Sequence, residues 1–463
     1  MTELRRDLGL WAAVSIVVGT VIGSGIFLVP KTMVLRVGSA EMVLFVFAFG
    51  GLLSLAGSLT YAELAAMMPE AGGEYVYLRE AYGPFFGFLY GWTQMWVAKS
   101  GSIATLATAF FYYLANFFPA LERVEGRIPM PLGPPLEIRS GQLLAMGVIA
   151  FLALVNYLGV RIGGRVQILV TVAKVALIGG IVVIGFGWGE GTVANLQSSV
   201  PATGGVAGFF AALVAALWAY DGWNNVSMVS SEVRNPQRNL PVALIFGTLG
   251  VMVIYLLTNW AYFYVLPASR VAASDRVAAE MMRGVLGAPG AGAVSVAAMI
   301  SIFAALNGSI LSGSRVPYAM ARDGFFFNAV GWVHPRFATP GVSILALSGW
   351  SMLLVLSGRY EQLFTYVIFA SWILYAMAAA SVIVLRLRRP EMPRPYKALG
   401  YPVVPILFVL VAVCLIVSTL VESPRESLLG LTLIFAGLPF YFYWKRSRSR
   451  HGGHSGPDPS TEA

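Results

Sequence analysis

The stretch Gly19-Thr-Val-Ile-Gly-Ser-Gly-Ile-Phe-Leu-Val-Pro30 lies inside the first hydrophobic run of the chain, which covers residues 8–29. Each of the glycines Gly23 and Gly25 costs an uninterrupted helix roughly 1 kcal/mol relative to alanine. We therefore predict that the helix is broken here, at mid-membrane depth. Lipid does not tolerate unpaired backbone N–H groups, so the break must line a cavity within the protein. N–H groups at the start of a half-helix attract carboxylates.

The composition indicates a polytopic membrane protein. The chain has 463 residues, of which 57% are hydrophobic and 11% are charged, whereas about 25% of the residues of a soluble protein are charged. About twelve apolar runs are present, and most are long enough to cross a bilayer as helices. The runs cover residues 8–30, 40–68, 84–118, 140–158, 165–188, 205–230, 240–266, 287–320, 340–357, 361–386, 402–421 and 428–444.

The net charge of +9 is interpreted as a signal of orientation and not of nucleic-acid binding. With the N-terminus placed inside, Lys and Arg are more frequent in the inner loops than in the outer ones, as the positive-inside rule requires. We expect a multi-pass protein of the inner (plasma) membrane, surrounded by the lipid bilayer, with both termini in the cytoplasm. Residues 446–463 are basic and then rich in Gly, Ser and Pro, which predicts a disordered cytoplasmic tail.

A second interruption falls in the sixth run, at Trp218-Ala-Tyr-Asp-Gly-Trp-Asn-Asn225. Gly222 and its polar neighbours predict an unwound turn. The two breaks take corresponding positions in two five-helix halves, residues 1–204 and 205–400, which must be inverted because five is odd. Paired interruptions in inverted repeats point to a transporter's binding site. Residues 401–445 supply helices 11 and 12, outside the repeat.

Signals of catalysis are missing from the sequence. It contains no Ser/His/Asp set, Walker loop, dinucleotide fingerprint or metal-ligand cluster, so we expect no enzyme activity, no cofactor and no metal site. The one cysteine, Cys414, lies in a predicted helix. An intrachain disulfide is impossible, and a covalent link to a partner is not expected.

Eight motifs follow one another from the first run to the tenth. They are VGTVIGSGIF (18–27), YAEL (61–64), RVQ (165–167) followed by Lys174, AYDGWNN (219–225), EVRNPQRNLP (232–241), YLLTNWAYF (255–263), NGSILSGSR (307–315) and RRPEMPRPYK (388–397). Together they resemble the amino acid–polyamine–organocation (APC) superfamily, and within it the L-type amino acid transporters and their bacterial relatives. The resemblance implies an all-α integral membrane protein with 12 transmembrane helices: a leucine-transporter-type 5+5 inverted repeat, with helices 1 and 6 broken, plus two C-terminal helices. It also implies sodium-independent movement of amino acids, commonly by exchange.

The two breaks together predict a site for a zwitterion. N–H groups of the first break would bind the substrate α-carboxylate, and carbonyl groups of the second would accept hydrogen bonds from the α-ammonium. Close helix packing by small residues is the alternative explanation of the glycines. The expected substrate-binding residues are Ile22, Gly23, Ser24, Gly25, Trp218, Ala219, Tyr220 and Asp221.

Lys174 is a charged residue deep within an apolar run, a position that is costly and by default functional. The resemblance places it against the unwound first helix, where sodium-coupled relatives hold an ion. Its ammonium would then bind carbonyls of that helix and a hydroxyl of the eighth, Ser309 or Ser312, so that no sodium is needed. Snorkelling to an interface and a proton-linked role are the alternatives.

Other gate and coupling roles rest on the resemblance. Trp218 resembles the family's aromatic gate, with a packing role as the alternative. Lys99 replaces an Arg frequent in relatives and is expected to face a partner or an internal vestibule. Tyr255 matches a seventh-helix tyrosine near the site. Asp221 is expected to be the N-cap of the second half-helix; pairing with a lysine, tuning of selectivity and proton transfer stay open.

Asn307 and Trp372 are candidates for the side-chain end of the pocket, although packing would explain them equally. The leading hypothesis is an exchanger (antiporter) of neutral L-amino acids that works by alternating access. The alternatives are a proton-coupled symporter and a transporter-like sensor. In animal relatives the outer loop at 119–139 supplies a disulfide to a glycoprotein subunit. That loop has no cysteine here, so we expect no disulfide-linked heavy subunit and a chain that works alone.

Overall fold

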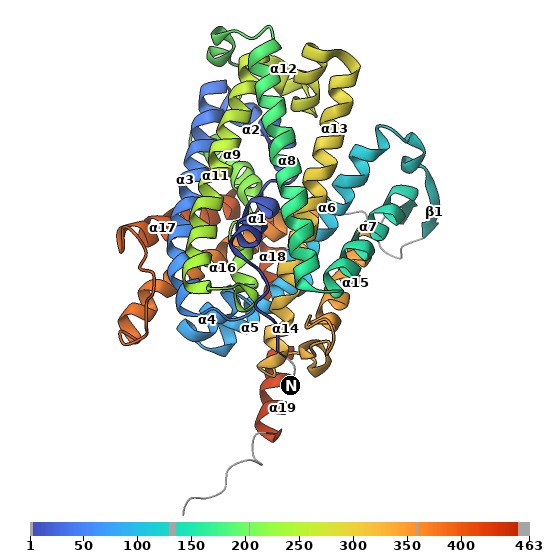
Figure 1. Cartoon of the computed structure of the whole chain (residues 1–463). Coiled ribbons are helices and arrows are strands. Elements are labelled where there is room, and N and C mark those ends of the chain that lie inside the picture. Colours follow the sequence, from blue (N-terminus) through green and yellow to red (C-terminus); the bar gives the residue numbers. More distant parts are fainter. Residues whose placement is uncertain (1–2, 129–135, 203, 358–359, 452–463) are drawn as a thin grey trace, which may run out of the picture.

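The apolar runs fold into a body of packed helices, shown in Figure 1 as a computed structural model. The structure describes residues 3–128, 136–202, 204–357 and 360–451. In chain order the α-helices are α1 (Leu10–Val21), α2 (Gly25–Val37), α3 (Ala40–Met67), α4 (Glu74–Tyr82), α5 (Pro84–Thr93), α6 (Lys99–Ala115), α7 (Ser140–Tyr157), α8 (Val160–Trp188), α9 (Gly205–Tyr220), α10 (Asn225–Met228), α11 (Pro236–Val265), α12 (Ala268–Ala273), α13 (Val277–Gly313), α14 (Arg315–Arg322), α15 (Gly341–Leu356), α16 (Tyr360–Arg388), α17 (Val403–Glu422), α18 (Pro424–Phe435) and α19 (Leu438–His451).

Both predicted breaks are present. α1 ends at Val21 and α2 begins at Gly25, with a bend of 41° between them. α9 ends at Tyr220, and the four-residue helix α10 begins at Asn225. Their physical cause is the one expected, because Gly23, Gly25 and Gly222 carry no side chain to favour a continuous helix.

The expected count of twelve spans is not reached by length and composition alone. Among the described residues, eight helices are long and apolar enough to cross a membrane, or nine if the bent pair α1–α2 is one span. α9 and α15 are apolar but shorter. The run at 84–118 is divided into α5, a π-helical turn (Gln94–Ala98) and α6. The 5+5 repeat and the division at residues 204 and 400 stay predictions.

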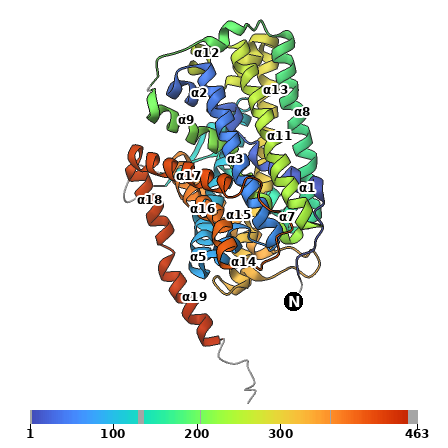
Figure 2. The ribbon, with the colours of Figure 1, turned by 90° about the vertical axis from the view of Figure 1, so that its left-hand side faces the viewer.

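The broken first helix packs against several other helices. α1 packs against α8, α11 and α13, while α2 packs against α9, and Figures 1 and 2 show these helices grouped around the breaks. The outer helices turn apolar side chains outward, as Leu169 and Val172 of α8 and Val417 of α17 do. Exposed apolar surface of this extent fits a lipid environment.

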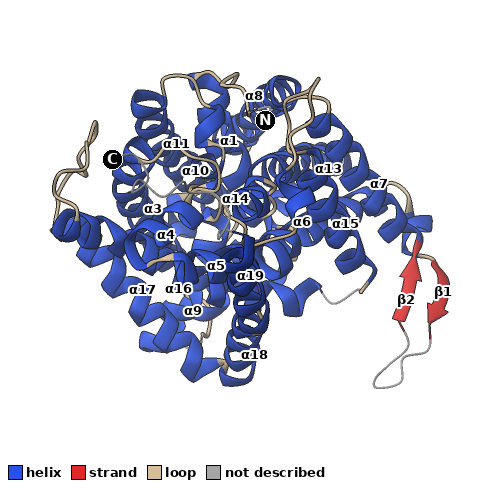
Figure 3. Ribbon diagram, turned by 90° about the horizontal axis from the view of Figure 1, so that it is seen from below, coloured by secondary structure: helices blue, strands red, loops and turns tan. Residues whose placement is uncertain are grey.

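A short antiparallel hairpin connects α6 with α7. It consists of β1 (Val124–Ile128) and β2 (Leu136–Arg139), with Val124 opposite Arg139 and Ile128 opposite Leu136. Figure 3 shows the hairpin projecting away from the helices.

The chain's C-terminal segment differs from the prediction of disorder from residue 446 onward. α19 continues as a helix through His451, and residues 452–463 lie outside the described residues. The polar stretch Lys445–Arg450 is helical because it extends an apolar helix that is already nucleated. α19 leaves the body at the end where the N-terminus lies (Figures 1 and 2).

Candidate functional site

The two breaks meet backbone to backbone. A Cβ added at Gly25 would lie 2.8 Å from the Cα of Ala219, so only glycine permits this approach. Gly222 has a left-handed φ of 105°, which glycine adopts without strain. The carbonyl of Gly222 accepts a hydrogen bond from Thr20 Oγ1 at 2.9 Å. The first half of one broken helix is thereby joined to the unwound turn of the other.

Gly25→Ala is therefore expected to force the breaks apart and to lower substrate affinity at least tenfold, about 1.4 kcal/mol of binding free energy. Titration calorimetry on the purified protein with a neutral L-amino acid, the substrate class expected from the sequence, would measure it. The matched control is Gly180→Ala on α8, where an added Cβ meets nothing within 4 Å. Equal affinities of the two variants would show that the close approach does not shape the site.

A small cavity of about 60 Å³ lies between the breaks. Nine of the predicted site residues line it: Gly23, Ser24, Gly25, Lys99, Trp218, Ala219, Asp221, Ser309 and Trp372. The remaining lining residues, which the sequence did not single out for the site, are Thr20, Val21, Ser102, Thr105, Leu106, Leu217, Gly222, Asn225 and Ser371.

The N–H groups at the start of α2 face this cavity from the first break. By helix geometry the first N–H groups of α2 have no partner within the helix, and its N-cap residue Ser24 makes no side-chain capping bond. Ile22 does not belong to this set, because its N–H bonds Val18 O at 3.1 Å and continues the ladder of α1. The first break thus presents N–H groups from Gly23 onward.

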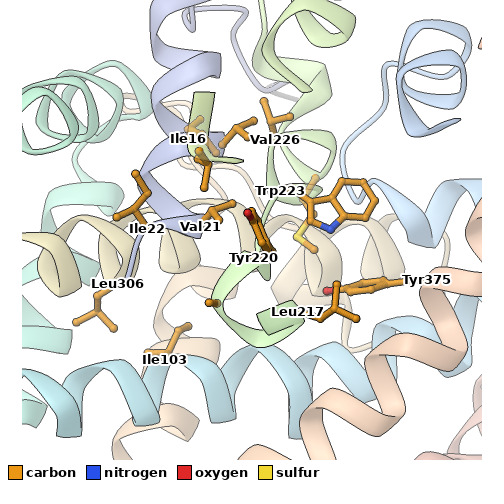
Figure 4. Packing of buried hydrophobic residues seen from close by; sticks show 14 of the residues in the cluster. Ile16, Val21, Ile22, Ile103, Leu217, Tyr220, Trp223, Val226, Leu306 and Tyr375 are labelled. Carbon is orange, nitrogen blue, oxygen red and sulfur yellow. The ribbon is translucent and has the colours of Figure 1, made fainter. Parts of the chain in front are cut away.

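Tyr220 and Asn307, two further predicted residues, lie outside the cavity lining. Tyr220 is buried, and its hydroxyl donates to Phe47 O of α3 at 3.2 Å. Asn307 donates to Gln167 Oε1 at 2.7 Å and accepts from Asn156 Nδ2 at 2.9 Å. Ser309, two residues on, lines the cavity, and a separation of two residues is about 200° around a helix. Asn307 therefore faces the helix bundle. Figure 4 shows the apolar packing around the breaks, with Ile22, Tyr220 and Trp223 among the buried residues.

Lys174 is fully buried and lies against the first break. Its Nζ donates to Gly19 O at 2.7 Å, to Ile22 O and to Ser301 O at 3.3 Å. The partner on α13 is Ser301, and not Ser309 or Ser312 as expected; Ser301 Oγ also donates to Ile22 O at 2.9 Å. Ser301 precedes Ser309 by about two helical turns, which brings it level with the break. Complete burial excludes snorkelling.

Tyr255 bridges the two breaks without lining the cavity. Its hydroxyl lies 3.0 Å from Val21 O and 2.9 Å from Ala219 O. A hydroxyl carries one hydrogen, so it donates to one of these carbonyls at a time. Tyr255 thus contacts the last turn of both half-helices.

Asp221 is not the N-cap of the second half-helix. The N-cap of α10 is Asn224, whereas Asp221 is the C-cap of α9 because the unwound turn extends through residues 221–224. Its carboxylate accepts a hydrogen bond from Tyr375 OH at 3.0 Å. Lys99 Nζ donates to Asn225 Oδ1 at 2.7 Å. Both Asp221 and Lys99 thus bond to neighbours other than each other.

Trp218 separates the cavity from a second, larger hollow. It lines both, together with Ser24 and Thr105. The larger hollow measures about 940 Å³ and reaches Arg276 and Glu422. It lies toward α12, at the end of the molecule opposite the N-terminus (Figure 1).

Almost the whole helical region matches a known family: the profile described as amino acid permease covers residues 8–442. The chain belongs to the amino acid permease family. The eight motifs and the APC resemblance are thereby confirmed, and the permease is a transporter and not an enzyme.

Curated relatives match this permease over nearly its whole length. A b(0,+)-type amino acid transporter 1 of Mus musculus is 34% identical over 445 residues, covering 95% of this chain and 88% of the relative. The serine/threonine exchanger SteT of Bacillus subtilis (strain 168) is 34% identical over 454 residues, covering 96% and 98%. A cystine/glutamate transporter of Homo sapiens is 30% identical over 443 residues, covering 95% and 85%.

Proposed function

We propose that this permease is a sodium-independent exchanger of small neutral L-amino acids that works by alternating access. The observation that carries the proposal is the pair of breaks on one cavity. Free N–H groups at Gly23, Ser24 and Gly25 offer positive partial charge to a carboxylate, and the C-terminal end of α9 near Ala219 offers carbonyl groups to an ammonium. An α-amino acid carries both groups on adjacent atoms.

The position of Lys174 supports the proposed sodium independence. Its ammonium takes up carbonyl oxygens of Gly19 and Ile22 on the first helix and of Ser301 on α13. Such carbonyls are the ligands that a bound sodium ion would need. A fixed positive charge there removes the need for a transported one.

A small neutral side chain fits the lining of the cavity. The cavity volume of about 60 Å³ corresponds to roughly four to six water-sized groups, at 10–15 Å³ each. Lys99 and Asp221 contribute one charge of each sign, and Leu106, Trp218 and Trp372 contribute apolar surface. The serine/threonine exchanger among the relatives agrees with this substrate class.

The N-terminus and the C-terminal helix α19 indicate how the permease is oriented in the membrane. We place the N-terminus and α19 in the cytoplasm, because they lie at one end of the molecule (Figure 2) and the inner loops are rich in Lys and Arg. The permease would work in the inner (plasma) membrane as a single chain, since its one cysteine, Cys414, lies on α17 and the loop at 119–139 has none for a disulfide with a partner.

Purified permease in liposomes preloaded with labelled serine would test this function. We expect efflux that requires unlabelled serine on the opposite side, proceeds equally in sodium and in choline, and shows no accumulation driven by a pH gradient. Equal efflux into a substrate-free medium would refute exchange, and accumulation along a pH gradient would favour proton symport through Asp221 or Lys174. Binding of serine without flux would indicate a sensor.

The gating role proposed for Trp218 has its own test. Trp218→Ala would join the cavity to the outer hollow, so the substrate is no longer enclosed and the KM for serine should rise about tenfold, or about 1.4 kcal/mol. Initial exchange rates in liposomes would measure the KM. Trp188→Ala, at a tryptophan that is 70% exposed, serves as the control. An unchanged KM in Trp218→Ala would leave Trp218 a packing residue.

A further inference from the structure

A buried carboxyl group contacts the unwound turn beside the cavity, and the proposed exchange mechanism does not use it. Glu74, the first residue of α4, is completely buried. It accepts hydrogen bonds from Asn224 Nδ2 and, at 3.0 Å, from Tyr90 OH of α5. α4 connects α3 with α5 outside the candidate membrane spans, at the same end of the molecule as the N-terminus (Figure 1).

The contact with Asn224 joins Glu74 to the unwound turn of the second broken helix. Asn224 lies between Gly222 and Asn225, which both line the cavity. The backbone confirms this docking, because Gly72 N donates to Met228 O of α10 at 2.9 Å. A separation of α4 from the turn would open the cavity at this end and expose Glu74 to water.

The surroundings of Glu74 offer little compensation for a charge. The ionisable groups that act on it are Tyr61 of α3, Tyr77 of α4, Tyr90 of α5, Lys99 of α6 and Tyr375 of α16. Lys99 is the one cation in this set, and its Nζ bonds Asn225. Burial raises the pKa of Glu74 to about 7, against the opposing effects of the hydrogen bonds from Asn224 and Tyr90 and the charge of Lys99.

We propose that Glu74 is a positioning residue of the transport cycle: its carboxyl holds a proton while α4 is closed on Asn224, and it releases that proton when this end of the cavity opens to water. The proton leaves to and returns from the same side, so none is carried across the membrane. This inference rests on the proposed alternating-access function.

The sign of the pH effect follows from linkage. The closed state binds the proton with a pKa of about 7, whereas a hydrated glutamate has a pKa of about 4.3. Because the closed state binds the proton more tightly, raising the pH favours the open state. Between pH 6 and pH 8 the ratio of open to closed molecules should rise about tenfold.

Thiol accessibility tests this without measuring flux. Ser227 of α10 is buried next to the start of α4. Ser227→Cys in a Cys414→Ser background places one thiol beneath α4, and its rate of reaction with a water-soluble maleimide would be followed from pH 6 to pH 8. The same rates, measured with Glu74→Gln added, serve as the reference. The ratio of the rate with Glu74 intact to the rate with Glu74→Gln reports the opening alone, because the ionisation of the thiol affects both rates equally.

We expect the ratio to rise about tenfold across this range, and Glu74→Asp to retain a rise. Tyr90→Phe removes a hydrogen bond that stabilises the ionised carboxyl, so the midpoint of the rise should move to higher pH. A ratio that does not change with pH, or a midpoint unaffected by Tyr90→Phe, would overturn the proposal. If accessibility follows pH but liposomes show no exchange, the proposed function fails and the role of Glu74 in opening stands.

Discussion

Lys174→Met is expected to lower amino acid exchange at least tenfold while the protein still folds. The substitution removes the ammonium from the carbonyls of Gly19, Ile22 and Ser301 but keeps an unbranched side chain that is only one atom shorter. Ile22 O keeps its hydrogen bond from Ser301 Oγ, whereas Gly19 O loses the ammonium. A buried carbonyl left without a donor costs about 1–3 kcal/mol, so the first break should leave the geometry that forms the cavity. A loss of 1.4 kcal/mol is already a factor of ten.

Exchange of labelled serine in liposomes would measure this effect, with thermal unfolding in detergent as the test of folding. Lys397→Met, at an exposed loop lysine, is the matched control. Lys174→Ala adds a second test, because it leaves space among the same carbonyls. If the flux of Lys174→Ala returns in sodium but not in choline, these oxygens form a cation-binding site. Near-normal flux in Lys174→Met would contradict the role assigned to Lys174.

Arg315→Met is expected to destabilise the fold by about 3–5 kcal/mol, because it leaves the carboxylate of Glu232 buried without its partner. Both side chains of this pair are completely inaccessible to solvent. Arg315 donates to Glu232 Oε1 at 2.6 Å and to Oε2 at 2.9 Å. It also donates to Leu311 O at 2.7 Å and to Ser314 Oγ at 2.9 Å. The pair therefore ties the segment after α10 to α14.

Thermal and denaturant unfolding in detergent would measure the loss. The double variant Arg315→Met with Glu232→Met should recover most of it, because replacing both members of a buried pair by apolar residues of similar volume is often nearly neutral. The control is Lys31→Met, which breaks an ion pair with an Asp275 side chain that is 87% exposed and should cost no more than about 1 kcal/mol. If Arg315→Met costs as little as Lys31→Met, the buried pair does not stabilise the fold.

The breaks themselves could be predicted from sequence because their causes are local. Gly23-Ser24-Gly25 weakens a helix wherever it occurs, and Asp221-Gly222 does the same. Lys174 could be singled out because an ammonium within an apolar run must find partners. Its contact with first-helix carbonyls agrees with the resemblance, while the partner on α13 was misassigned by two helical turns.

The errors concern the side of a helix that faces the cavity. Asn307 and Tyr220 lie in the correct segments, yet both point away from the cavity, and the N–H of Ile22 bonds within α1. Asn307 could have been assigned only with knowledge of Asn156 and Gln167, which are 151 and 140 residues away in sequence. Successive side chains of a helix point in directions about 100° apart, so a shift of one or two residues moves a side chain from the cavity to the core. The apolar sequence of α13 does not show which of its faces is turned to the cavity.

By itself, the sequence determined the helical membrane class, the family, the positions of the two breaks and the chemistry expected at Gly23, Ser24 and Gly25. These depend on composition, motif order and glycine, which act within a few residues. The tertiary structure decided that the breaks meet at Gly25 and Ala219, that Tyr255 joins them, and that Glu74 reaches Asn224 150 residues away. Such contacts depend on how helices rotate and pack, and that depends on the whole chain folding at once.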